Sequence, residues 1–154
     1  MKDAVHPPKT NGHLLALQKM AANKDAMPPI AKLIGFDLLE VALGKTVIGF
    51  EAGERHHNPM GTLHGGVICD VADAAMGTAI ATTLEDDESF TTLDLNAKYF
   101  KPIWNAQLRA TARVVKRTRS LGLIECEVED DGGSLVAKVF STCMVLRGAE
   151  AKGR

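Results

Sequence analysis

The sequence is poor in cysteine, in aromatic side chains and in long apolar runs. Its three cysteines, Cys69, Cys126 and Cys143, lie far apart and form no CxxC pair, which argues against a disulfide framework or a zinc ribbon. No segment reaches the roughly 18 uninterrupted apolar residues of a membrane span, and the first residues lack the apolar core of a signal peptide. We therefore expect reduced, buried thiols, no membrane partner and a cytoplasmic location.

The chain also has no excess of acidic or basic side chains. The chain of 154 residues has 18 basic and 19 acidic side chains, a net charge of −1. Because nucleic-acid-binding modules normally carry a basic excess, we expect no nucleic-acid partner. The hydrophobic content of 45% is enough to fill the core of one ordinary domain.

The apolar pattern predicts an α+β domain in which an antiparallel sheet wraps around one long buried helix. That helix is expected at residues 64–84, where Val, Ile and Ala predominate and bulky polar groups are scarce. The other expected elements are a short helix at 13–24, a brief helix ending at Gly35, a hairpin of strands 36–43 and 46–52 joined at Gly44-Lys45, and strands at 90–100, 107–117, 121–130 and 135–146.

The chain divides by composition into three parts. Residues 1–29 are expected to form an N-terminal arm, loose over 1–12, with a short helix. Residues 30–147 hold the predicted sheet and the long helix, and residues 148–154 form a C-terminal tail. No repeat or linker divides the middle part, so we expect it to be a single domain.

Residues with chemical potential gather where the long helix begins. Gly65 and Gly66 have no Cβ, so a ligand could reach their backbone amides at the positive end of the helix dipole. Asp73 lies deeper in the helix among Val and Ala residues. Burying a carboxylate among apolar side chains costs free energy, so its presence there favours a functional role. Asn58 and His64 precede the helix in a polar loop.

The spaced pattern Asn58-x5-His64-Gly65-Gly66-x6-Asp73 resembles the signature of hotdog-fold acyl-CoA thioesterases, in the PaaI-like branch of the 4-hydroxybenzoyl-CoA thioesterase superfamily. The stretch 91–102 is similar to that family's next strand. The resemblance covers roughly residues 30–147. It implies a hotdog fold and a hydrolase that converts an acyl-CoA thioester into a free carboxylic acid and coenzyme A, with no metal and no cofactor besides the substrate's own coenzyme A.

The resemblance also implies a role for each matching residue. Asp73 matches the helix carboxylate that attacks the thioester or activates a water molecule. The backbone amide of Gly65 matches the donor that polarises the thioester carbonyl, while Asn58 and His64 match loop residues that orient the carbonyl or the water. Thr92 falls near a strand hydroxyl that holds the nucleophilic water in some members.

Candidate contacts to coenzyme A are Gly66, Arg117 and Arg119. Arg109, Arg113 and Arg117 repeat at even spacing along one predicted strand, so a row of guanidinium groups could meet the nucleotide phosphates or simply face water. The loop histidines fit the spacing of no common metal site, and we expect no bound metal.

The spacing between Gly65 and Asp73 predicts an oligomer. The two residues are eight positions apart, or about 12 Å along a helix that rises ~1.5 Å per residue. A nucleophile and an oxyanion donor must both reach atoms of one carbonyl group. We therefore expect the two groups to come from different subunits of a homodimer. The family resemblance implies that a homotetramer built from two such dimers is common, and the choice between a dimer and a tetramer stays open.

Several points stay open from the sequence. Asp73 could be a nucleophile or a general base. Asp70, one turn earlier on the same helix face, could tune Asp73, pair with a basic group or face water. A non-catalytic acyl-CoA binding or sensing module and a hotdog dehydratase or hydratase are the alternatives to a thioesterase. An aromatic and a medium-chain acyl group are equally compatible with the candidate pocket residues, which are Leu33, Phe36, Met60, Met76 and Trp104.

Overall fold

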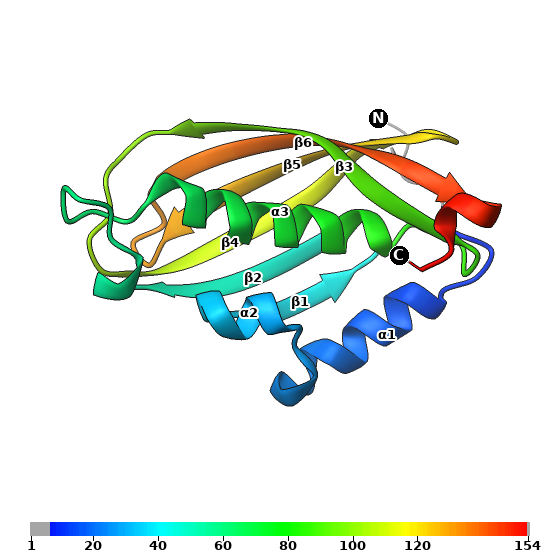
Figure 1. The fold of residues 1–154 in the computed structure, drawn as a ribbon, viewed down its shortest axis with the longest axis horizontal. Helices are drawn as coiled ribbons and strands as arrows, with labels where there is room; N and C mark the ends of the chain where they lie inside the picture. The colour runs from blue at the N-terminus through cyan, green and yellow to red at the C-terminus, as the bar shows by residue number, and fades with distance from the viewer. Residues whose placement is uncertain (1–6, 154) are drawn as a thin grey trace.

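The computed structural model describes residues 7–153, which form a curved six-stranded antiparallel sheet with one long helix on its concave face (Figure 1). This confirms the predicted α+β arrangement. The helices are α1 (Gly12–Ala21), α2 (Pro29–Ile34) and α3 (Gly65–Ala81), and short 3-10 turns lie at Lys24–Ala26, Glu54–His56 and Gly148–Ala151. The strands are β1 (Phe36–Ala42), β2 (Lys45–Ala52), β3 (Glu88–Tyr99), β4 (Ala106–Arg117), β5 (Leu121–Asp130) and β6 (Leu135–Arg147).

The strand order is β1-β2-β4-β5-β6-β3, so β1 and β3 are the edges of the sheet. Helix α3 crosses the concave face and contacts all six strands (Figure 1). Its alanines at 72, 75 and 79 are fully buried, and their small side chains let the sheet approach closely. The approach is close at Gly122 on β5, where an added Cβ would lie 2.3 Å from Cδ1 of Ile80.

The hairpin between β1 and β2 turns one residue earlier than predicted. Ala42 pairs with Lys45, which leaves Leu43 and Gly44 as the turn. Gly44 has a φ of +68°, a left-handed conformation that glycine adopts at little cost. Glycine is therefore the second turn residue rather than the first.

The predicted long helix ends at Ala81, three residues earlier than expected. The hydroxyl groups of Thr82 and Thr83 donate to the carbonyl oxygens of Ala79 and Ile80, both at 2.7 Å. These bonds satisfy carbonyls that the end of a helix leaves free. No helix within residues 7–153 is long and apolar enough to cross a membrane.

The N-terminal segment is attached to the turn that follows α3. The expected loose arm over 1–12 falls partly outside the described residues, but Lys9 and Thr10 donate their backbone amides to the Glu85 carboxylate at 3.0 and 3.1 Å. The amide of Gly12 donates to Asp86 at 3.0 Å, at the first turn of α1. Hydrogen bonds thus hold residues 9–12 against this turn, and this part of the arm is not loose. Helix α1 lies beside β1 (Figure 1).

Candidate active site

Asp73 projects from the middle of α3 toward the edge strand β3. The hydroxyl of Thr92 on β3 donates to Oδ1 of Asp73 at 3.2 Å. Burial raises the pKa of the Asp73 carboxyl, the Thr92 hydrogen bond opposes that rise, and the negative charge of Asp70 adds to it. Asp70 itself is exposed and forms no ion pair within residues 7–153.

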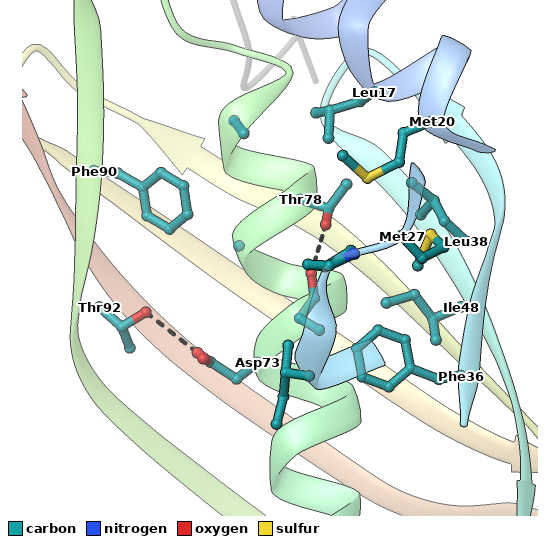
Figure 2. Close-up of a pocket in the computed structure, with 15 residues that line it drawn as sticks. Leu17, Met20, Met27, Phe36, Leu38, Ile48, Asp73, Thr78, Phe90 and Thr92 are labelled. Carbon is teal, nitrogen blue, oxygen red and sulfur yellow. Dashed lines mark hydrogen bonds between the residues drawn. The ribbon is translucent and has the colours of Figure 1, made fainter. Parts of the chain in front are cut away.

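Asp73 and Thr92 lie at a cavity of about 340 Å³, which we call the Asp73 cavity (Figure 2). Its walls come from α1, the segment around Met27, strands β1, β2 and β3, and one face of α3. Figure 2 shows Phe90 of β3 on one side and Met20 of α1 on the other. Apart from Asp73 and the hydroxyls of Thr78 and Thr92, the side chains that line it are apolar.

The structure brings only one of the sequence-derived pocket candidates into this cavity. Phe36 lines it. Leu33, Met60 and Trp104 are 77%, 82% and 56% exposed, whereas Met76 is fully buried in the core. The other apolar lining residues come from α1, from the segment 27–30 and from β1, β2, β3 and α3. The distance of α1 from Asp73 in the sequence gave no sign of this contact.

The start of α3 offers a free backbone donor. His64 is the N-cap residue, and its Nδ1 accepts the amide of Gly66 at 2.9 Å. The amide of Gly65 forms no hydrogen bond within the described part of the chain. Gly65 therefore presents an unpaired N–H at the positive end of the helix dipole, as the sequence predicts.

Tyr99, which the sequence did not single out, supports this helix start. Its hydroxyl donates to the carbonyl oxygen of Gly65 at 2.9 Å and lies 3.0 Å from the sulfur of Cys69. Burial, with the Cys69 contact, raises the pKa of Tyr99 to about 12, so the phenol keeps its proton at neutral pH. A Cβ at Gly65 would lie 3.1 Å from the Tyr99 ring, so the ring also limits this position to a small residue.

Asn58 organises the loop before α3. Its Nδ2 donates to the Thr62 hydroxyl at 2.9 Å, and its Oδ1 accepts the amides of Met60 and Thr62 at 2.9 and 3.2 Å. One hydrogen of the Asn58 amide group is left over from these bonds. These bonds close the loop 58–62, which leads into the start of α3.

Within one chain the candidate residues form two separate groups. Asp73 and Thr92 make one group, and Gly65 lies with His64 and Gly66 in the other. Helix α3 is continuous from Gly65 to Ala81, so about 12 Å of helix separates Gly65 from Asp73. One copy of the chain cannot bring the amide and the carboxylate to the same carbonyl group.

The row of arginines predicted on one strand face is interrupted. A β-bulge lies between Val114 and Lys116 of β4, and the extra residue turns the following side chain to the other face. Arg117 consequently pairs with the buried Glu88 at 3.0 Å and is only 11% exposed. Arg113 stays on the exposed face, and Arg119 is exposed in the turn that follows β4.

No group of three or more His, Cys, Asp and Glu side chains within residues 7–153 is placed to hold a metal ion. His56 has a structural role instead. Its Nδ1 accepts the amide of Gly53 at 3.2 Å, and its Nε2 lies 2.8 Å from the carbonyl oxygen of Ile34. The ring therefore links the turn after β2 to the end of α2.

The sequence profile of the thioesterase superfamily matches residues 60–137, which include Gly65, Asp73 and Thr92. A 1,4-dihydroxy-2-naphthoyl-CoA hydrolase of Listeria monocytogenes is 29% identical over 75% of this chain and 93% of its own length. Acyl-coenzyme A thioesterase 13 of Mus musculus is 26% identical over 75% of this chain and 88% of its own.

Solved structures agree with the sequence relatives. A mutant of the phenylacetic acid degradation protein PaaI from Thermus thermophilus superposes with a TM-score of 0.71 at 29% identity. The match covers 76% of this chain and 98% of that protein. The similarity therefore extends over nearly the whole of a PaaI subunit.

Proposed function

This chain belongs to the thioesterase superfamily, and from that membership we propose that it hydrolyses an acyl-CoA thioester with Asp73 and the amide of Gly65, at a site shared between two copies of the chain. The observation that carries the proposal is the Asp73 carboxylate, partly buried at an apolar cavity with a hydroxyl bound to it. A protein that only bound acyl-CoA would gain nothing from burying that charge beside the thioester.

The Gly65 amide polarises the thioester in the proposed reaction. Its N–H donates to the carbonyl oxygen, where negative charge develops as the carbon is attacked, and the α3 dipole stabilises that charge. His64 and Asn58 line the same approach and orient the carbonyl or the water. Because the His64 ring accepts the neighbouring Gly66 amide, it leaves the Gly65 amide to the substrate.

Two routes are open to Asp73. As a general base it takes a proton from water, the hydroxide oxygen bonds to the thioester carbon, the carbon–sulfur bond breaks, and Asp73 returns the proton to the departing thiolate. As a nucleophile its oxygen bonds to the carbon and expels the thiolate, and water then hydrolyses the anhydride. Either route yields a carboxylic acid and coenzyme A, and Thr92 holds the attacking water or the carboxylate.

The edge strand β3 supports the shared site. Thr92, which touches Asp73, and Tyr99, which touches Gly65, lie toward opposite ends of this unpaired edge. Antiparallel pairing of two β3 strands about a two-fold axis near Asn96 would set Tyr99 of the second copy opposite the Thr92 end of the first. The Gly65 amide of that copy would then approach Asp73.

The remaining expectations concern the contacts with coenzyme A, the assembly of the chains and the location in the cell. We propose Gly66, Arg117 and Arg119 as contacts for coenzyme A, although Arg117 must then share its guanidinium with Glu88. A tetramer built from two such dimers and a cytoplasmic location stay predictions.

The first experiment measures thiol release from a panel of aromatic and straight-chain acyl-CoAs. Wild type should turn over at least one ester, and Asp73→Asn should lose at least about 100-fold in kcat/KM. Asp70→Asn is the matched control, since it changes the same group one turn away and should keep activity within a few-fold. Saturable binding without thiol release would support a binding module instead, and hydration of an unsaturated ester would support a hydratase.

A second experiment tests whether two copies share the site. Chains carrying Asp73→Asn and chains carrying Gly65→Pro are each inactive in the proposal, and proline suits the first position of a helix. Mixed dimers would contain one intact site, so equal random mixing should restore about a quarter of wild-type activity. Gly65→Ala keeps the N–H and controls for contact with Tyr99. Inactivity of the mixture would place the whole site in one chain.

A further inference from the structure

The Asp73 cavity follows one face of helix α3. Asp73, Gly77 and Ala81 lie four residues apart and line it together with their neighbours on the same face. At ~1.5 Å per residue, the stripe from Asp73 to Ala81 is about 12 Å long. The cavity therefore extends from the candidate carboxylate toward the C-terminal end of α3, away from the exposed Asp70.

Helix α1 closes this cavity on the side opposite β3 (Figure 2). Leu17 and Met20, three residues apart on one face of α1, line the cavity and are half-buried. Leu15 lies on another face and is 47% exposed. Figure 2 shows Leu17 and Met20 near the Thr78 end, far from the Asp73 carboxylate along α3.

The position of this wall is fixed by polar contacts at both ends of α1. Glu85 and Asp86, in the turn after α3, accept the amides of residues 9, 10 and 12. Farther along the helix, the side-chain amide of Gln18 donates to the carbonyl oxygen of Val41 at 3.2 Å. The wall is thus held between the turn that follows α3 and strand β1.

Among the side chains that line the far part of the cavity, Thr78 is the polar one, and its hydroxyl oxygen can accept a hydrogen bond but has no proton free to donate. The Thr78 hydroxyl donates its proton to the carbonyl of Ala74 at 2.7 Å. The side chains beyond it are apolar, among them Met20, Leu17 and Phe90. A charged substituent, or a polar one that needs a hydrogen-bond donor, would lose its water there without replacement, which disfavours binding.

We propose that Leu17 and Met20 form the end wall of the acyl-binding cavity and select an unsubstituted acyl chain of medium length. An extended alkyl chain advances slightly less than one carbon–carbon bond of about 1.5 Å per carbon, so about 12 Å accommodates roughly eight to ten carbons. This inference rests on the proposed thioesterase function, because it assigns the acyl end of the same substrate.

The test compares kcat/KM for hexanoyl-, octanoyl-, decanoyl-, dodecanoyl- and palmitoyl-CoA, with 4-hydroxybenzoyl-CoA as the polar aromatic ester. Wild type should prefer the octanoyl and decanoyl esters. Met20→Ala should raise the ratio of dodecanoyl to octanoyl activity at least about tenfold, and Met20→Trp should lower it by a similar factor. Leu15→Ala changes the same helix outside the cavity and should leave the ratio unchanged.

The possible outcomes separate this inference from the proposed function. If wild type hydrolyses esters of the panel but neither Met20 variant shifts the ratio of dodecanoyl to octanoyl activity, the assignment of Leu17 and Met20 as the end wall is wrong. A preference of wild type for 4-hydroxybenzoyl-CoA overturns the substrate class. If wild type hydrolyses none of the esters, the proposed function itself fails. Loss of stability cannot produce opposite shifts in the two Met20 variants, and thermal unfolding of each confirms its folding.

Discussion

At the scale of single residues, the protonation of Asp73 is set by three influences of different sign. Burial raises its pKa most, the Thr92 hydrogen bond lowers it, and the charge of Asp70 raises it. Only the ionised carboxylate can act as base or nucleophile. Activity should therefore fall on the acid side as pH drops through the pKa of Asp73, and its two neighbours should move that limit in opposite directions.

We predict that Asp70→Asn moves the acid limb of kcat/KM to lower pH and Thr92→Val moves it to higher pH. The first change removes a negative charge that opposes ionisation, and the second removes a hydrogen bond that favours it. Full pH–rate profiles of both variants and wild type measure the shifts. The Asp70 effect should shrink in high salt, because this side chain is exposed. Shifts of the same sign would contradict the prediction.

Tyr99 is predicted to act by positioning the start of α3. Tyr99→Phe removes the hydroxyl that donates to the Gly65 carbonyl and should lower kcat about tenfold, with a stability loss of about 1 kcal/mol. Cys69→Ala is the matched control, because it removes the other contact of the hydroxyl and leaves the Gly65 bond intact. Steady-state kinetics and urea unfolding distinguish the two effects. An equal kcat in Tyr99→Phe and wild type would exclude the role.

At the scale of elements, local sequence predicted most boundaries because each depends on nearby residues. The glycine pair at the start of α3, the apolar run of this helix and the alternation along the later strands all act over a few positions. The bulge in β4 has no comparable local signal, and it moved Arg117 to the opposite face. The attachment of Thr10 to Glu85 and of Tyr99 to Gly65 joins residues far apart in the chain, which periodicity cannot reveal.

The ends of three strands meet in a buried ion pair network. Glu88 at the start of β3 accepts from Arg117 of β4 at 3.0 Å and from Arg147 of β6, and its side chain is only 7% exposed. Removing one member of such a network leaves uncompensated charge in a poorly hydrated place.

We predict that Glu88→Gln lowers the free energy of unfolding by about 3 kcal/mol. Glu127→Gln is the control, because Glu127 pairs with Lys138 on the surface with its side chain 48% exposed and should cost less than about 1 kcal/mol. Urea denaturation of both variants measures the difference. Equal losses of unfolding free energy in the two variants would mean that the buried ion pairs of Glu88 contribute no more to stability than an exposed pair.

At the scale of the whole molecule, the proposed site exists only when two chains associate. Specific activity should therefore decline on dilution in parallel with the dimer fraction. Sedimentation velocity and thiol release, measured over the same range of protein concentrations, test this relation. A monomer with full activity would refute both the shared site and the pairing of β3 edges.

The contacts of α3 with all six strands also determine how the domain opens. Because Ala72, Ala75 and Ala79 are enclosed by the whole curved sheet, their amides can exchange hydrogen with solvent only when the domain unfolds as one cooperative unit. Helix α1 has no fully buried residue, so we expect it to open at a lower free energy than α3. Hydrogen exchange should therefore be slow in the central helix and faster in the peripheral helix that lines the Asp73 cavity.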